Sequence, residues 1–249
     1  MALLRIVAAL EHPDGRWQRQ FAERAAELGD REALGVATTQ LFADAITARD
    51  RDEMSRMHPV LLSLIDPETS PRVAGWVYYS LGGEAYIDGH FEQAYEYACL
   101  SVERATQIGH SYMLVCALEA RLLARSAVTG QISQPELVEV FELARRHGVH
   151  SVAVAALWFV ARYAAAVDPE SALRWLTLAE RISTEFDAGP TLEEVLRAET
   201  MEVLGITDIG PLLSAAPPFD PATTLDEVAA WVASRSPTES AERLPVLSY

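Results

Sequence analysis

The stretch YYSLGGEAYIDGHFEQAYEYACLS, residues 78–101, decides the fold class of this 249-residue chain. From residue 91 onward, apolar residues recur at every third or fourth position and fill one face of a helix: Phe91, Ala94, Tyr95, Ala98, Val102 and Ala105. Another apolar helical run comes before it, and the turn signal Ile-Asp-Gly-His at 87–90 separates the two. The stretch therefore predicts a helical hairpin whose apolar face must be buried.

The same apolar spacing returns along the chain. Its anchor residues Met54, Ala94, Leu137 and Ala172 lie 40, 43 and 35 residues apart, and each anchored helix follows a turn signal. Such a hairpin cannot bury its apolar face alone, so successive hairpins stack on their neighbours. We therefore predict an all-α fold, a right-handed α-solenoid of roughly four to five hairpins. No alternation of apolar and polar residues argues for a sheet.

Capping signals mark the helix boundaries. Ser70-Pro71 and Asp168-Pro169 place a capping side chain before a first-turn proline. Capping-box spacing occurs in Ser133 with Glu136, Thr191 with Glu194 and Thr224 with Glu227. The predicted helices span residues 2–11, 16–29, 31–48, 52–65, 71–88, 90–108, 111–128, 134–147, 150–166, 169–186, 191–204 and 222–235.

The domain organisation follows from these boundaries. We expect one helical repeat domain over residues 1–205, without a linker inside it. Several prolines after Gly210 then interrupt the helices, so a Pro-rich connection and a C-terminal capping helix are expected over 206–237. Residues 238–249 are expected to form a mobile tail.

The charge of the chain limits its partners. The sequence has 36 acidic and 20 basic residues, a formal net charge of −16, and its only basic cluster is the short Arg145-Arg146-His147. Such a chain repels phosphate backbones, so we expect no direct binding to nucleic acids. Every basic residue is an arginine, which excludes a Walker A lysine and Schiff-base chemistry.

Cysteine usage and the N-terminus bear on location. Cys99 and Cys116 are too few for a disulfide framework, which favours a reducing compartment. The apolar run at residues 1–10 is too short to span a membrane and lacks a cleavage site. We therefore expect a cytoplasmic protein without a membrane partner.

No motif predicts catalysis or a cofactor. The six histidines form neither a His-Glu-x-x-His motif nor a pair at i, i+4, so structural roles are favoured over metal binding. Neither a nucleophile elbow nor a dinucleotide-binding glycine loop occurs. Acidic pairs such as Glu193-Glu194 are typical of a solvated helix face. We therefore expect a protein that is not an enzyme and holds no cofactor or metal.

Residues 78–101 also carry a family resemblance. They follow the pattern Y-x-x-L-G-x-x-x-Y-x-x-G-x-F-x-x-A-x-x-x-A-x-x-S, which resembles the tetratricopeptide (TPR) repeat. In this pattern Gly82 lets paired helices approach, Gly89 makes the turn, and Ala94 is small where two helices cross. The resemblance covers about residues 1–186, with 191–204 as a plausible capping helix.

The TPR resemblance implies a binding groove. The first helices of TPR hairpins line a concave surface, and the candidate lining residues are Trp76, Tyr79, Tyr86, Arg121, Arg125 and Arg162. If they converge, the arginines offer guanidinium forks for a carboxylate or a peptide terminus between aromatic walls. The alternatives are that the rings pack in the core and that the arginines are solvated and paired with nearby acids.

A second resemblance concerns the C-terminal part, from Asp168-Pro-Glu-Ser-Ala-Leu-Arg-Trp-Leu to the helix around Glu227-Val-Ala-Ala-Trp231. It looks like the helical C-terminal ends of large actinobacterial ATP-binding transcription regulators, including antibiotic-pathway and LuxR-type regulators. The chain has neither their phosphate-binding loop nor a helix-turn-helix. The resemblance implies a regulatory setting, in which nucleotide and DNA functions are absent or lie on another protein.

Together these patterns favour a non-catalytic, TPR-like module in transcriptional or signalling regulation, binding a protein, a peptide or a small-molecule effector. Two alternatives remain open: a sensor that encloses a small effector, and an unrecognised all-α enzyme. A closed apolar pocket would favour the sensor, an open groove would favour peptide binding, and a buried carboxylate–histidine pair would favour the enzyme. The sequence leaves the partner and the oligomeric state open.

Overall fold

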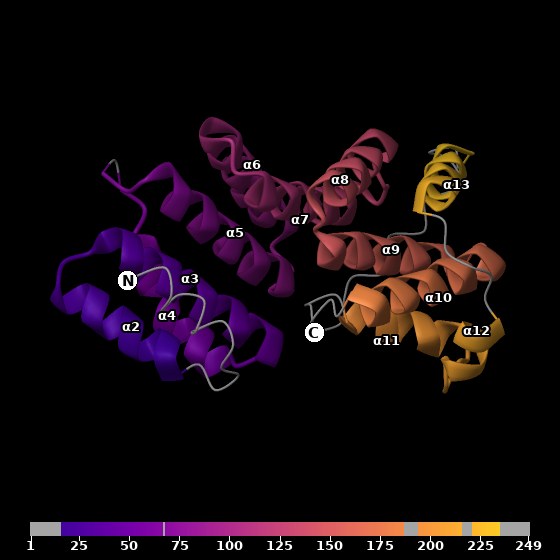
Figure 1. Cartoon of the computed structure of the whole chain (residues 1–249), viewed down its shortest axis with the longest axis horizontal. Helices are drawn as coiled ribbons and strands as arrows, with labels where there is room; N and C mark the ends of the chain where they lie inside the picture. The colour runs from indigo at the N-terminus through magenta and orange to yellow at the C-terminus, as the bar shows by residue number, and fades with distance from the viewer. Residues whose placement is uncertain (1–15, 67, 187–193, 216–220, 235–249) are drawn as a thin grey trace.

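The computed structural model describes residues 16–66, 68–186, 194–215 and 221–234, and all regular structure in them is helical (Figure 1). The helices are α2 (Arg16–Glu27), α3 (Arg31–Ala48), α4 (Arg51–Ser63), α5 (Pro71–Ile87), α6 (Phe91–Ile108), α7 (Ser111–Thr129), α8 (Gln134–His147), α9 (His150–Ala164), α10 (Pro169–Phe186), α11 (Glu194–Val203), α12 (Gly210–Ala215) and α13 (Pro221–Ser234). The predicted all-α fold class is confirmed over these residues.

Most of the predicted helices appear close to their expected bounds. Those predicted over 31–48, 134–147 and 169–186 match α3, α8 and α10 to the residue. The helices α4 and α9 end two residues earlier than predicted, at Ser63 and Ala164. The helix predicted over 2–11 and the tail predicted over 238–249 lie outside the described residues.

The segment after Gly210 differs from the prediction, which placed no helix between 205 and 221. The short helix α12 forms there because Pro211 occupies its second position, where a backbone N–H would have no helical partner anyway. The carboxylate of Asp208 accepts a hydrogen bond from the N–H of Gly210 at 2.9 Å, which helps to start the helix. A proline in the first turn is therefore compatible with this helix.

The capping predictions were partly correct. Ser70 Oγ accepts a hydrogen bond from the Val73 N–H at 3.2 Å, and Asp168 caps α10 through the Ser171 N–H at 3.2 Å. The capping box predicted at Ser133 is wrong, because Ser133 makes no side-chain cap hydrogen bond. The box predicted at Thr224 is also wrong, because α13 begins earlier, at Pro221. The box at Thr191 lies outside the described residues.

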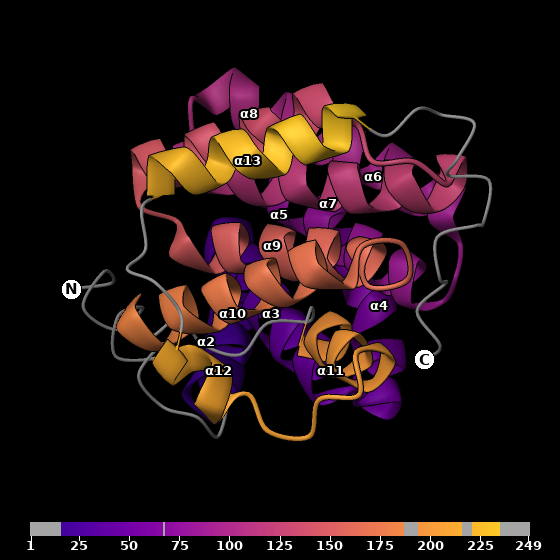
Figure 2. The ribbon, with the colours of Figure 1, turned by 90° about the vertical axis from the view of Figure 1, so that its right-hand side faces the viewer.

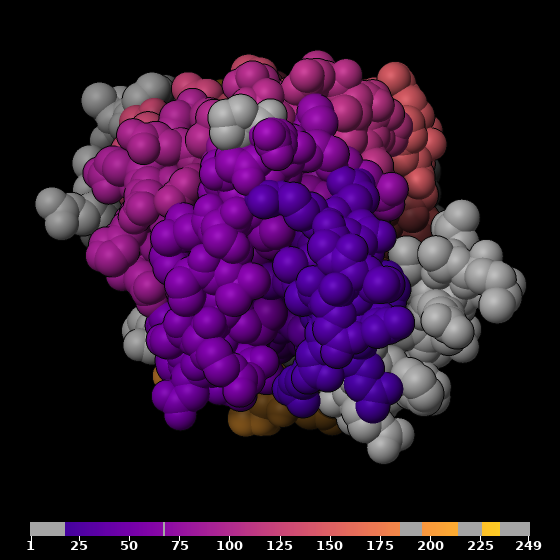
Figure 3. All heavy atoms as spheres, turned by 90° about the vertical axis from the view of Figure 1, so that its left-hand side faces the viewer, coloured from indigo at the N-terminus to yellow at the C-terminus, as the bar shows by residue number. Residues whose placement is uncertain are grey.

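The helices are arranged as an arch. From α2 to α11 each helix packs on the next one, and in addition α3 packs on α5, α5 on α7, α7 on α9 and α9 on α11. Figure 1 shows α6 and α8 at the top of the arch, α2 to α4 at its left and α9 to α12 at its right. In the space-filling view of the left-hand end, the indigo and violet N-terminal helices form the surface (Figure 3).

Small residues set the closest helix crossings. Gly82 lies where α5 approaches α6: a Cβ added there would be 3.4 Å from Tyr97 Cβ and 3.5 Å from the Ala94 carbonyl oxygen. Ala94 is buried, as its expected position at the crossing requires. A tighter approach occurs at Gly35 of α3, where an added Cβ would be 2.3 Å from Val73 Cγ1. These positions explain how α3, α5 and α6 pack so closely.

The buried apolar side chains form two main clusters. One is built chiefly from α7, α8, α9 and α10, and the other from α3, α4 and α5. Between them lies a small cluster of three alanines, Ala85, Ala94 and Ala124. The core is therefore divided along the array, with a seam of small side chains where α5, α6 and α7 meet.

The helix α13 turns back onto the array. It packs on α8, and its ring Trp231 lies edge-on to Trp175 of α10 and to Tyr163 of α9, with centroids 4.8 and 6.1 Å away. The Trp231 Nε1–H donates a hydrogen bond to the Asp168 carboxylate at 2.6 Å. Figure 2 shows α13 running across α8 at the right-hand end of the molecule.

Candidate binding surface

An aromatic cluster connects two successive hairpins. The ring of Trp76 on α5 lies 5.6 Å from Tyr79, 5.9 Å from Tyr112 and 6.4 Å from His110, measured between centroids. Trp76 and Tyr79 are partly buried, whereas Tyr112 keeps 50% of its surface exposed. Since exposed aromatic rings are frequent anchors in interfaces, this cluster is the candidate binding surface.

Local sequence places each ring of this cluster. The cap at Ser70 and the proline at position 71 start α5, so that Trp76 and Tyr79 lie three residues apart on one side of the helix. On α7, His110 caps the helix: its Nδ1 accepts a hydrogen bond from the Met113 N–H at 3.2 Å. This bond fixes the imidazole beside Trp76 and puts Tyr112 in the first turn of α7.

Two acidic side chains act on the exposed tyrosine. Negative charge on the Cys116 thiolate, then burial, a hydrogen bond with Cys116 and the charge of Glu119 together raise the pKa of Tyr112 to about 12. Glu119 is only 4% exposed, and Cys116 is also buried. At neutral pH the Tyr112 hydroxyl is therefore protonated, and the ionisable side chains that act on it are both acidic.

Arg121 and Arg125 do not join the aromatic cluster. Arg121 is nine residues beyond Tyr112, half a turn around α7, so the two side chains lie on opposite sides of the helix. Both arginines pair with Glu136 of α8, Arg121 Nε at 3.2 Å and Arg125 Nη1 at 3.1 Å from its carboxylate. For Arg121 and Arg125, the alternative that the arginines pair with nearby acids is therefore confirmed. The Glu136 carboxylate is occupied by these two ion pairs, so it is not available to complete the capping box at Ser133.

The other predicted groove residues are also dispersed. Tyr86 lies at the far end of α5, with its ring 5.3 Å from that of Phe91. Arg162 of α9 forms an ion pair with Glu199 of α11 at 3.0 Å, and both side chains are mostly buried. Among the six candidates, the rings of Trp76 and Tyr79 contact each other, and Trp76, Tyr79 and Tyr86 all pack against the larger core cluster, as the core-packing alternative predicted. The structure adds Tyr112 and His110, which the sequence did not single out.

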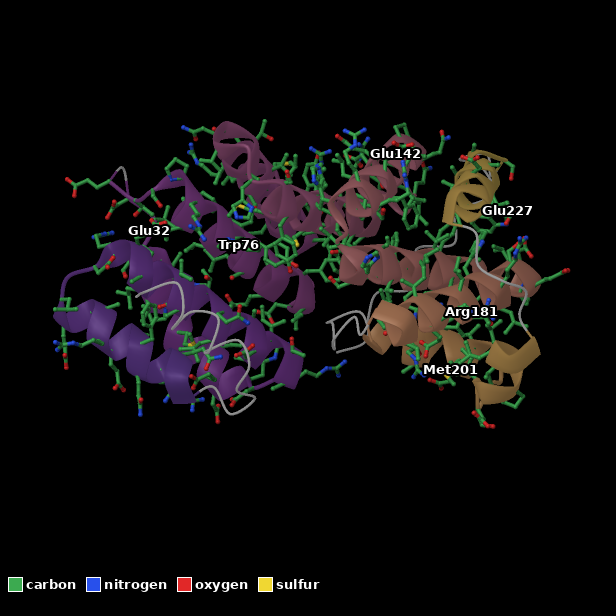
Figure 4. All side chains as sticks on the ribbon, viewed as in Figure 1. Glu32, Trp76, Glu142, Arg181, Met201 and Glu227 are labelled. Atoms are coloured by element: carbon green, nitrogen blue, oxygen red, sulfur yellow. The ribbon has the colours of Figure 1, made fainter. Side chains whose placement is uncertain are left out.

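A separate polar group joins α9, α10 and α11. The Trp158 Nε1–H donates to Glu180 Oε1 at 3.2 Å, and the same carboxylate forms an ion pair with Arg197. Figure 4 shows Trp76 on α5, whereas Arg181 and Met201 lie in the opposite half of the molecule with α10 and α11. The contacts of Glu180 hold helices together and lie apart from the aromatic cluster.

The carboxylate–histidine contact between α4 and α5 bears on the enzyme alternative. His58 Nδ1 lies 2.6 Å from Glu84 Oε2, but the His58 side chain is 40% exposed. It is therefore not the buried pair that would favour catalysis. Among the described residues no group of histidine, cysteine and acidic side chains could hold a metal ion, and none of their helices is long and apolar enough to cross a membrane.

Comparisons with known proteins do not assign the chain: no family model, curated protein or solved structure matches it.

Proposed function

We propose that this chain is a non-catalytic, TPR-like binding module that recognises a protein or peptide partner through the aromatic cluster of α5 and α7. The observation that carries the proposal is the half-exposed ring of Tyr112, which lies against Trp76 of the preceding hairpin. Tyrosine and tryptophan contribute most to binding energy at interfaces because they bury a large area with few rotatable bonds.

The packing of the helices supports a repeat arrangement. The contacts of α3 with α5, α5 with α7, α7 with α9 and α9 with α11 form a continuous row. A row of equivalent helices in a helical array presents an extended surface to a partner. The TPR-like pattern at 78–101 lies in α5 and α6, so the aromatic cluster joins the hairpin that most resembles the family to the first helix of the next one.

The regulatory setting is the second part of the proposal, and it rests on the resemblance of the C-terminal part to actinobacterial transcription regulators. The contacts of α13 support a capped C-terminal end of the helical array, because the Trp231 ring packs on Tyr163 of α9 and Trp175 of α10. In this proposal the chain acts as an adaptor that brings its partner to a regulatory complex.

Site-specific photo-crosslinking in the native host tests the proposal. A benzoyl-phenylalanine at position 112 replaces one exposed ring by another, so the fold is expected to persist. The control carries the same residue at position 103, because the Glu103 side chain is 62% exposed on α6. We expect a discrete protein adduct from position 112 and not from position 103. No adduct at 112, or the same adducts from both positions, would contradict the proposed surface.

A further inference from the structure

We propose that the cluster of Trp76, Tyr79 and Tyr112 binds a cationic side chain, arginine or lysine, in a basic segment of the partner protein. This inference rests on the proposed function, because it names the partner chemistry of the same surface. The faces of aromatic rings carry partial negative charge and attract cations, most strongly for tryptophan. Two tyrosines beside Trp76 provide further ring surface for the same cation.

The local charges favour a cation over an anion. The two ionisable side chains that act on the Tyr112 hydroxyl are Cys116 and Glu119, and both are anionic when charged. Arg72, one turn before Trp76 on α5, is exposed and is not among the groups that act on this hydroxyl. No basic side chain is among the groups that act on this hydroxyl, so a guanidinium or ammonium beside Tyr112 would meet the rings without a repelling charge there.

The arginines that could have bound an anion are already paired. Arg121 and Arg125 share Glu136 on the opposite side of α7, and Arg162 pairs with Glu199. A carboxylate ligand at the aromatic cluster would thus lie away from these guanidinium groups. This arrangement reverses the charge that the sequence suggested for the ligand.

The overall charge and the shape of the rings suit a basic peptide. The net charge of −16 accelerates the approach of a positively charged segment and opposes an acidic one. The aliphatic stem of arginine or lysine can lie on the apolar rings while its charged end stays near water. One side chain of the partner can therefore use both the apolar surface and the negative field.

Fluorescence anisotropy with three labelled peptides tests the inference. The peptides share a Gly-Ser backbone and carry arginine, the neutral isostere citrulline, or glutamate at the same positions. The protein variants are Tyr112→Ser, which removes an exposed ring without changing charge, and Glu119→Gln, which removes the buried carboxyl group. Glu103→Gln is the matched control, because it removes an exposed charge on the side of α6 away from α5. Circular dichroism establishes that each variant is folded.

We expect the arginine peptide to bind more tightly than the citrulline peptide. Tyr112→Ser is expected to weaken its binding by roughly two- to thirty-fold, the range of a cation–π contact. Glu119→Gln should weaken it in the same direction, and Glu103→Gln should change it much less. If Glu119→Gln fails to fold, the binding of the arginine peptide to Tyr112→Ser still tests the inference.

Three results would overturn the inference. In the first, the arginine peptide binds Tyr112→Ser as tightly as the parent, which would show attraction by net charge alone. In the second, the citrulline or glutamate peptide binds best and Tyr112→Ser weakens that binding. This result would keep the proposed binding surface but show that its ligand is not cationic. In the third, no peptide binds at millimolar concentration while position 112 still crosslinks to a partner in the host. Failure of the crosslink itself would instead remove the proposed function.

Discussion

Replacing Gly35 by alanine tests how closely α3 and α5 pack. An alanine Cβ would lie 2.3 and 2.9 Å from the two γ-carbons of Val73 and 3.2 Å from its Cβ. Val73 is 2% exposed and β-branched, so its side chain cannot rotate away without meeting other atoms. Overpacking of this kind costs about 1–3 kcal/mol, while alanine in a helix gains about 0.5–1 kcal/mol over glycine. We expect the free energy of unfolding to fall by about 1–2 kcal/mol.

Urea denaturation followed by circular dichroism measures this change, and the thermal midpoint is expected to fall by roughly 2–8 °C. Gly83→Ala is the matched control, because the added Cβ would meet only the flexible end of Ile46 at 3.3 Å. This control should leave the stability unchanged or raise it by about 0.5–1 kcal/mol. In the Gly35→Ala background, Val73→Ala should cost less than it does in the parent, because it relieves the overlap. A Gly35→Ala protein as stable as the parent would refute the described crossing of α3 and α5.

Further predictions concern other parts of the chain. Ala94→Leu should lower stability by about 1–3 kcal/mol in thermal melts, because Ala94 is 2% exposed at the crossing of α5 and α6. Trp231→Phe removes the hydrogen bond to Asp168 but keeps a ring, so we expect a loss of about 1–2 kcal/mol in urea, smaller than for Trp231→Ala. The pKa of Tyr112 is about 12 in the folded state and 10.0 ordinarily, so the folded state holds this proton more tightly and the free energy of unfolding should fall as pH rises from about 10 to about 12. Tyr112→Phe removes the titrating hydroxyl and should make this fall, measured as the urea midpoint, smaller. Gel shifts at physiological salt should show no submicromolar binding of duplex DNA by the isolated chain, because its net charge is −16.

The hairpin at residues 78–101 was predictable because its signals are local. The apolar period of α6, the turn at Gly89 and the small residue Ala94 all act within one hairpin, and the structure has α5 and α6 there. Capping was less predictable, because Glu136 had a choice of partners. Ion pairs with two arginines of α7 compete with the capping box at Ser133, and only the packed hairpin shows which interaction forms.

The sequence did not predict which side of α7 faces which neighbouring helix. Buried residues lie almost all round this helix, so apolar periodicity does not distinguish the side of Tyr112 from the side of Arg121. The buried Glu119 gives no sequence signal either, because an isolated acid in an apolar helix resembles a surface residue. The position of α13 depends on the contacts of Trp231 with helices far away in the sequence, which a Pro-rich connection does not specify.

The seam of Ala85, Ala94 and Ala124 has a consequence for how the chain opens. Alanines let the helix backbones approach closely, and α5 with α6 and α6 with α7 form the most extensive helix contacts of the described residues. Three tyrosines, Tyr86, Tyr95 and Tyr97, also pack against the seam. Hydrogen exchange is therefore expected to be slow in α5, α6 and α7 together, so that these three helices open late rather than first. The rings of Trp76 and Tyr79 pack against the larger cluster, so a ligand held between α5 and α7 would slow exchange in these helices further.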